Sequence, residues 1–256
     1  MVWLIVAALA AALVAIALRA RRRIARVERR LEASSRELEA LQHAFSRFAP
    51  AEVVEEIIAQ GVSTHAEKKE ITVLFADLKG FTAMAERLDP AELVTILNEY
   101  FERMSRVIAT HRGHVSKFIG DGILALFGAL EANPWQTNDA VHAAFAMQAS
   151  LAELNAQLAA NGGPTLAMGV GIHRGEVVAG VIGSAALVEY GVIGSTVNVA
   201  SRVQDLTRVH GVDVLVTAAV RERLDRRIAV RALPPVAVKG LPEPVATFMV
   251  APGSGV

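Results

Sequence analysis

The chain opens with an apolar run, Met1 to Leu18, that contains no charged side chain. As a helix rising ~1.5 Å per residue, this run would extend roughly 27 Å, close to the ~30 Å hydrocarbon core of a bilayer. Five arginines follow within residues 19–26. Because positive residues stay on the cytoplasmic side, the pattern predicts a single-pass transmembrane helix over residues 1–19 in an inner or plasma membrane, with the remainder cytoplasmic. A cleaved signal peptide or a buried helix is the alternative, although signal-peptide charges precede the apolar run.

Apolar residues then recur three and four positions apart from Ile24 to Phe48, with arginine and glutamate on most of the other faces. This heptad pattern predicts a short parallel coiled coil within a helical connector, residues 20–62. An amphipathic helix packed on its own domain is the alternative. Pro50 marks a break in the connector, and the polar composition of residues 63–69 predicts a linker.

The rest of the chain alternates between strand-like and helix-like patterns. Residues 70–76 are nearly all apolar and β-rich, as expected for a buried strand. Residues 90–111 place apolar side chains at helical spacing. Strands alternate with helices along residues 63–252, which predicts an α+β domain with an antiparallel-rich sheet covered by helices. The other elements predicted with defined ends are strands over residues 114–119 and 123–127 and a helix over residues 136–160.

Composition limits the chemistry that the chain can perform. The 26 basic and 26 acidic residues balance, so the net charge does not indicate nucleic-acid binding. The sequence contains no cysteine, which excludes disulfides, thiol catalysis and thiolate zinc sites and is typical of a reducing compartment. Three histidines are expected to be surface or core residues and not metal ligands: His142, His173 and His210.

Two aspartates stand out by their position. Asp77 ends a predicted strand and precedes a short loop with Gly80, and Asp121 lies between two glycines in the turn of a predicted hairpin. Each alone is typical of an ordinary turn. If the two strands are neighbours in one sheet, both carboxylates reach the same edge, where they suit Mg²⁺ or Mn²⁺. The free N–H groups of the loop would then face phosphate oxygens.

Four ordered blocks carry a resemblance to a known family: ITVLFADLKGFT at residues 71–82, KFIGDGILALFG at 117–128, YGVIGSTVNVASR at 190–202, and VKG at 238–240. From about residue 45 to residue 250, the chain resembles the class III adenylyl/guanylyl cyclases, in a bacterial-type, membrane-anchored form with a single catalytic domain. The resemblance implies a ferredoxin-like βαββαβ core with a C-terminal extension.

The resemblance also implies a two-metal reaction. Asp77, Asp121 and the Leu78 carbonyl would hold two Mg²⁺ or Mn²⁺ ions per site. One ion would activate the ribose 3′-hydroxyl of ATP and the other would neutralise the triphosphate. The hydroxyl would attack the α-phosphate in line, giving 3′,5′-cyclic AMP and pyrophosphate. Further residues implied to bind substrate are Gly80, Phe81 and Thr82.

The resemblance assigns the remaining substrate-binding roles to residues of the third and fourth blocks. Asn198 would orient the ribose, Arg202 would stabilise charge on the α-phosphate, and Lys239 would hold the terminal phosphates. Asn198 and Arg202 are four residues apart, so they share one face of a helix, which supports a joint role independently of the family. In this family the metal-binding aspartates of a site come from one domain, and the residues that bind the base, the ribose and the α-phosphate come from a second. This chain has one such domain that contains both kinds of residue. The resemblance therefore implies a symmetric homodimer with two shared sites, held together by the coiled coil.

Two positions bear on the choice of base. Lys117 stands where the family selects the purine, and its ammonium can donate to N1 of adenine. Gly191 occupies the position whose side chain usually accepts from the adenine amino group, so some activity with GTP is expected. Residues 184–189 lack the basic residue that many relatives place near the phosphates. The alternatives to an active adenylyl cyclase are a nucleotide-binding homologue without turnover and a membrane-linked dimerisation module.

Overall fold

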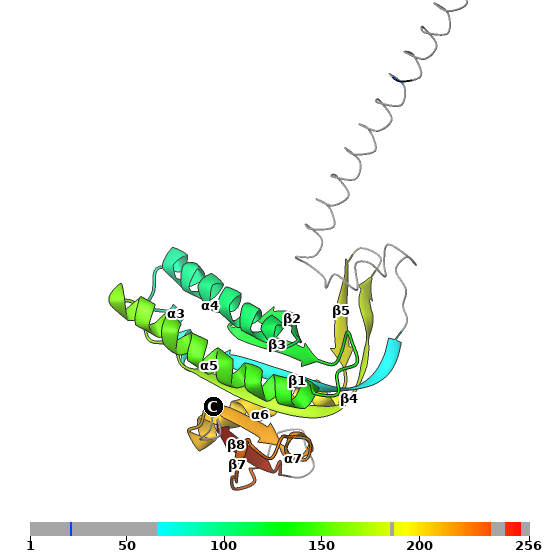
Figure 1. The fold of residues 1–256 in the computed structure, drawn as a ribbon. Helices are drawn as coiled ribbons and strands as arrows, with labels where there is room; N and C mark the ends of the chain where they lie inside the picture. Colours follow the sequence, from blue (N-terminus) through cyan, green and yellow to red (C-terminus); the bar gives the residue numbers. More distant parts are fainter. Residues whose placement is uncertain (1–20, 22–65, 185–186, 237–243, 252–256) are drawn as a thin grey trace, which may run out of the picture. The chain divides into compact units, whose positions relative to one another are not determined.

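The computed structural model describes residue 21 and residues 66–184, 187–236 and 244–251 (Figure 1). The chain divides into two compact units, Met1–Val62 and Ser63–Val256, and every element named below belongs to the second unit. The predicted transmembrane helix, the coiled coil and Lys239 lie outside the described residues. Within the described residues, no helix is both long enough and apolar enough to cross a membrane.

A long strand, β1 (Ala66–Leu78), lies in the middle of the sheet and buries its apolar half. It pairs antiparallel with β3 (Gly122–Phe127) on one side and with β4 (Met168–Ser184) on the other. The predicted linker over residues 63–69 is therefore wrong from Ala66 onward, because residues 66–69 pair with residues 177–180 of β4. These polar residues form an exposed continuation of a buried strand, so they lack an apolar pattern.

The sheet has the order β2-β3-β1-β4-β6-β8-β7, and β5 pairs with β4 outside this path. All pairings are antiparallel except that of β4 with β6. The order β2-β3-β1-β4, with a helix after β1 and another after β3, is that of a ferredoxin-like βαββαβ core, which confirms the predicted α+β topology. The remaining strands are β2 (Gly113–Ile119), β5 (Leu187–Ile193), β6 (Val214–Thr217), β7 (Ala229–Ala232) and β8 (Thr247–Ala251).

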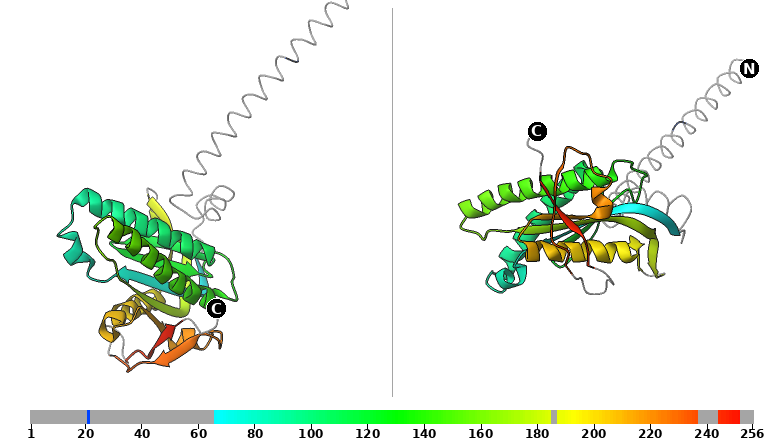
Figure 2. Two further views of the ribbon diagram at one scale, coloured as in Figure 1. Left: turned by 60° about the vertical axis from the view of Figure 1, so that its left-hand side comes forward. Right: turned by 90° about the horizontal axis from the view of Figure 1, so that it is seen from below.

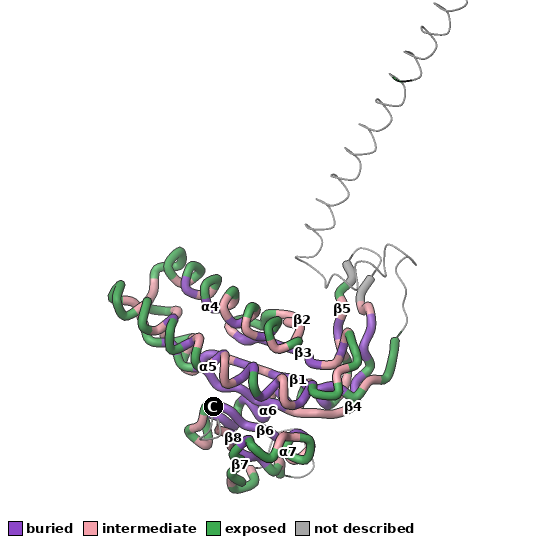
Figure 3. The backbone as a smooth tube through the Cα atoms, viewed as in Figure 1, coloured by how far each residue is buried: buried purple, intermediate pink, exposed green. Residues whose placement is uncertain are grey.

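Two long helices, α4 (Pro90–Thr110) and α5 (Gln136–Ala160), lie side by side and share one core with the sheet (Figure 1). The Asp89 side chain caps α4 by accepting from the Ala91 N–H at 2.9 Å. Buried positions gather where the helices face the strands (Figure 3). The observed ends of both helices agree with the predicted ranges, 90–111 and 136–160, to within one residue. The inner face of α4 is made of Ile96, Tyr100, Met104 and Ile108.

Helix α6 (Ser195–His210) lies on the opposite side of the strands from α5 (Figure 2). It approaches β4 so closely that a Cβ at Gly171 would lie 2.2 Å from the Gln204 nitrogen and 2.7 Å from the Ala200 oxygen. Only glycine fits at that contact, which fixes α6 against the strand that neighbours β1. Two short helices complete the unit, α3 (Phe81–Ala85) and α7 (Ala218–Arg221).

Candidate active site

Asp77 and Asp121 meet at one edge of the sheet. Ala76 of β1 is paired with Ile123 of β3, so the end of β1 lies beside the turn between β2 and β3. The Leu78 N–H donates to Asp121 Oδ2 at 3.2 Å, which ties that turn to the end of β1. A Cβ on Gly122 would lie 3.4 Å from Asp77 Oδ1. Neighbouring strands therefore bring together the two acids that the sequence singled out.

The pairing of these acids is electrostatically unfavourable. Burial and the negative charge of Asp121 together raise the pKa of Asp77 to about 6, although the nearby Arg208 partly offsets both. Beneath them, burial and the two carboxylates also raise the pKa of Tyr100, so its hydroxyl stays protonated and donates to Met168 Sδ at 3.2 Å. Because the folded-state pKa of Asp77 is raised from 3.8 to about 6, folding free energy is lost as the pH rises between these two values, and the full cost is present above about 6. A cation at this edge relieves that cost.

Arg208 is a site residue that sequence reasoning missed. Its Nη2 atom donates to Asp77 Oδ2 at 2.5 Å and to the Leu78 carbonyl at 3.1 Å. The guanidinium thus contacts two of the three groups that the resemblance assigns to metal ions. Arg208 stands six residues after Arg202 with Asp205 midway, a spacing visible in the sequence. That spacing does not reveal that α6 packs against β1 and brings the arginine to the acids.

The residues at this edge fit a hard divalent cation. The donor set of Asp77, Asp121 and the Leu78 carbonyl contains only oxygen atoms, which Mg²⁺ and Mn²⁺ prefer. The guanidinium already lying on Asp77 and Leu78 marks the place as one that favours positive charge. Within the described residues, no group of three or more His, Cys, Asp or Glu gathers to hold a metal. The other positions around a cation would therefore be filled by substrate oxygens or water.

Replacing Arg208 by alanine is expected to strengthen the binding of Mn²⁺ roughly two- to five-fold, because a half-exposed ion pair contributes about 1 kcal/mol at most. The reason is competition, since the guanidinium and the cation use the same oxygens. Melting temperatures recorded over a range of Mn²⁺ concentrations would give the apparent affinity. Arg208→Lys keeps a positive charge and serves as the control. An equal or smaller Mn²⁺-dependent shift in Arg208→Ala would show that Arg208 does not compete.

A second group contains the residues predicted to contact the base. On β2, Lys117 donates to Glu189 Oε1 at 2.6 Å. Gly191 is buried on β5, and a Cβ added there would lie 3.4 Å from Ile182 Cδ1 and 4.0 Å from Glu189 Oε1. The sequence had pointed to residues 184–189 only for their lack of a basic residue. Glu189 is therefore a second neighbour of the site that sequence reasoning missed.

Asn198 and Arg202 lie exposed on α6, and because this segment is a helix, their spacing of four places them on one face. Arg202 pairs with Asp205 on the same helix at 3.5 Å. Within the described part of the chain, no hydrogen bond joins Lys117 or Arg202 to the carboxylates of Asp77 and Asp121. The structure therefore brings the two aspartates together, whereas Lys117 and Arg202 of the same chain pair with Glu189 and Asp205 instead.

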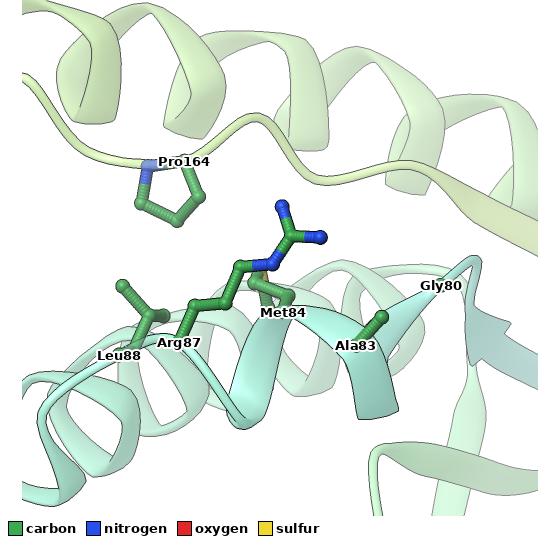
Figure 4. Close-up of a pocket in the computed structure, with 6 residues that line it drawn as sticks. All are labelled: Gly80, Ala83, Met84, Arg87, Leu88 and Pro164. Carbon is green, nitrogen blue, oxygen red and sulfur yellow. The ribbon is translucent and has the colours of Figure 1, made fainter.

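The turn between β1 and α3 contains Gly80 in the left-handed conformation, at φ 73°. Phe81 packs against the core, and the Thr82 carbonyl accepts from the Glu86 N–H at 3.2 Å. A pocket of about 370 Å³ borders this turn, and Figure 4 shows one arginine, Arg87, among otherwise uncharged lining residues. The pocket excludes both metal acids, so it is not assigned to the substrate. Its lining is Gly80, Ala83, Met84, Arg87, Leu88 and Pro164.

Comparison with known proteins supplies the chemical context. A family model described as the adenylate and guanylate cyclase catalytic domain matches residues 63–252. An adenylate cyclase of Anabaena cylindrica is 36% identical over 202 residues, covering 76% of this chain and 39% of that protein. Adenylate cyclase 1 of Rhizobium meliloti (strain 1021) is 33% identical over 198 residues, covering 77% of this chain and 30% of that protein. The crystal structure of the guanylyl cyclase Cya2 matches with a TM-score of 0.67 and 37% identity, covering 74% of this chain and 95% of that one.

These similarities leave the base undecided. The two curated relatives are named as adenylate cyclases at 36% and 33% identity, and the solved structure is named as a guanylyl cyclase at 37%. The matches cover only 39% and 30% of the curated relatives' own lengths. Overall identity therefore does not separate ATP from GTP, and the residues around Lys117 are the ones that bear on this choice.

Proposed function

Because this chain belongs to the adenylate and guanylate cyclase catalytic domain family, we propose that it converts ATP to 3′,5′-cyclic AMP and pyrophosphate at sites shared by two copies. The observation that carries this proposal is the meeting of Asp77, Asp121 and the Leu78 backbone at one sheet edge, as an acidic donor set made of oxygen alone. A turn aspartate without such a role has no reason to face a second carboxylate.

Asp77, Asp121 and the Leu78 carbonyl would hold the divalent cations, Mg²⁺ or Mn²⁺, with two per site. When bound, the cations lower the pKa of the ribose 3′-hydroxyl and neutralise charge on the triphosphate. The protein's own task at this edge is to hold the acids in place, which the pairing of β1 with β3 does. Gly80 and the first two residues of α3, Phe81 and Thr82, follow shortly after Leu78 and would bind phosphate oxygens.

Groups from the second copy would complete the site. Asn198 would orient the ribose, and Arg202, four residues later on the exposed face of α6, would stabilise the charge that grows on the α-phosphate. Lys239, which lies outside the described residues, would hold the terminal phosphates. Lys117 would donate to N1 of the adenine. Each of these groups acts by position and charge, so none has to carry a covalent intermediate.

Exposed apolar side chains beside the site support a dimer. Four of them are one or two residues from proposed site residues, and each is about half exposed or more. Apolar side chains left exposed next to site residues favour a surface that another protein covers, and a second copy is the partner that the shared site requires. The four are Phe118 (48% exposed), Ile119 (50%), Ile193 (59%) and Val209 (66%).

The N-terminal residues give the proposed location of the protein in the cell. We propose that residues 1–19 anchor the chain in an inner or plasma membrane as a single span and that residues 20–62 pair two copies as a coiled coil. The catalytic unit would then lie in the cytoplasm, where ATP and Mg²⁺ are available. Nucleic acid is not a proposed partner, because the net charge is zero.

The direct test is the reaction itself. Full-length protein in detergent, given ATP and Mn²⁺, is expected to release cyclic AMP and pyrophosphate in equal amounts, with GTP as the slower substrate. Chromatography of the nucleotides and a coupled pyrophosphate assay would measure both products. If neither nucleotide gives a cyclic product with either Mn²⁺ or Mg²⁺, the chain is not a cyclase.

A further inference from the structure

The ion pair between Lys117 and Glu189 joins two strands that are not neighbours in the sheet. β2 is at one end of the strand order, whereas β5 pairs only with β4. The Lys117 Nζ atom donates to Glu189 Oε1 at 2.6 Å, across 72 positions of sequence. The side chains are 38% and 56% exposed, and an ion pair as exposed as this contributes little to folding. Both charged ends are therefore accessible to a bound molecule.

The Glu189 carboxylate also lies close to Gly191, which has no side chain of its own. Residues two apart on a strand lie on the same face, so the glutamate and the glycine share one side of β5. A Cβ at Gly191 would be 4.0 Å from Glu189 Oε1, and its nearest neighbour, Ile182 Cδ1, would be at an ordinary 3.4 Å. The glutamate carboxylate thus lies beside the position from which a longer residue 191 would reach the base.

We infer that Glu189 accepts the hydrogen bond of the adenine 6-amino group while Lys117 donates to adenine N1. This inference rests on the proposed cyclase function and deepens it. Adenine presents a donor and an acceptor next to each other on this edge, and the lysine–glutamate pair presents a matching donor and acceptor 2.6 Å apart. Glu189 would thereby replace the acceptor that Gly191 lacks.

The same geometry discriminates against guanine. Guanine carries an oxygen acceptor at the position of the adenine amino group and an N–H donor at N1. If guanine lay in the position assigned to adenine, Glu189 would face O6 and Lys117 would face N1–H, so neither hydrogen bond could form. Guanine would have to shift until O6 lay at Lys117 and N1–H at Glu189, which fits GTP as the slower substrate. Leaving two acceptors opposed in a binding site costs far more than losing one methylene contact. Glu189 is therefore expected to set the preference between bases and not the rate of the chemical step.

The experiment compares kcat/KM for ATP and GTP in the full-length protein. Glu189→Ala is expected to lower the ATP-to-GTP ratio roughly 10- to 100-fold, as expected for a lost hydrogen bond to a charged group. Glu189→Gln keeps an oxygen acceptor and is expected to recover part of the ratio. Glu176→Ala is the matched control, because Glu176 is also an exposed glutamate paired with a lysine, Lys68, at 3.0 Å. Its ratio is expected to equal that of the wild type.

The possible outcomes separate this inference from the proposed function. If the wild type forms cyclic nucleotide but Glu189→Ala leaves the ratio unchanged or raises it, Glu189 does not read the adenine amino group. If the wild type forms no cyclic product, the cyclase proposal fails, and displacement of a fluorescent nucleotide by ATP and by GTP then measures the same preference by affinity. Equal loss of both nucleotides in Glu189→Ala would show a structural role and would overturn the inference.

Discussion

Asp77→Asn and Asp121→Asn are each expected to reduce cyclic AMP production about 10³-fold or more. Asparagine keeps the size of the side chain but removes the charge that holds a divalent cation. The loss of a cation that contributes several kcal/mol to transition-state stabilisation corresponds to about three powers of ten in rate. The measurement is kcat/KM for ATP at saturating Mn²⁺, with each variant purified as the full chain.

The stability of these variants separates a catalytic role from a structural one. Burial and Asp121 raise the pKa of Asp77 to about 6, so the ionised pair costs folding free energy above that pH. Asp77→Asn is therefore expected to melt at the same temperature as the wild type or higher at pH 8 without metal. Asp213→Asn is the control, because Asp213 is an exposed carboxylate that pairs with Lys79 at 2.7 Å. Near-normal activity in Asp77→Asn would contradict the metal assignment.

The fold was predictable where periodicity is strong. The helices α4 and α5 and the hairpin of β2 and β3 follow from apolar spacing and from glycine turns, and their observed ends are within one or two residues of the prediction. The first residues of β1 were not predictable in this way. Glu67, Lys68 and Lys69 pair with β4 but carry charged side chains, so no apolar pattern marks them as a strand.

The site was predictable where it depends on neighbouring strands and not where it depends on distant packing. Asp77 is the residue before the last of β1, and Asp121 lies in the turn that precedes β3, so the pairing of β1 with β3 is enough to bring them together. Arg208 and Glu189 reach their partners across 131 and 72 positions of sequence. Such contacts depend on how α6 packs on the sheet and on how β5 extends from β4. The pattern of apolar and polar residues does not indicate either arrangement.

Mixing two inactive variants is expected to restore activity. Asp77→Ala disables the metal site of its own chain, and Arg202→Ala disables the group that its chain gives to the partner's metal site. In a dimer of one chain of each kind, one site has both defects and the other has none. If the chains exchange at random, half of the dimers are mixed and each has one of two sites intact, so activity is expected to reach roughly a quarter of wild type.

Complementation by mixed dimers tests most directly the central claim that each site is built from two copies. Each variant would carry a different affinity tag, and tandem purification would isolate dimers that contain both chains. The isolated mixed dimers are predicted to convert ATP at about half the wild-type rate per dimer, whereas each variant alone stays at background. Background activity in verified mixed dimers would contradict a shared site, because each substitution would then disable the site of its own chain and leave no site intact.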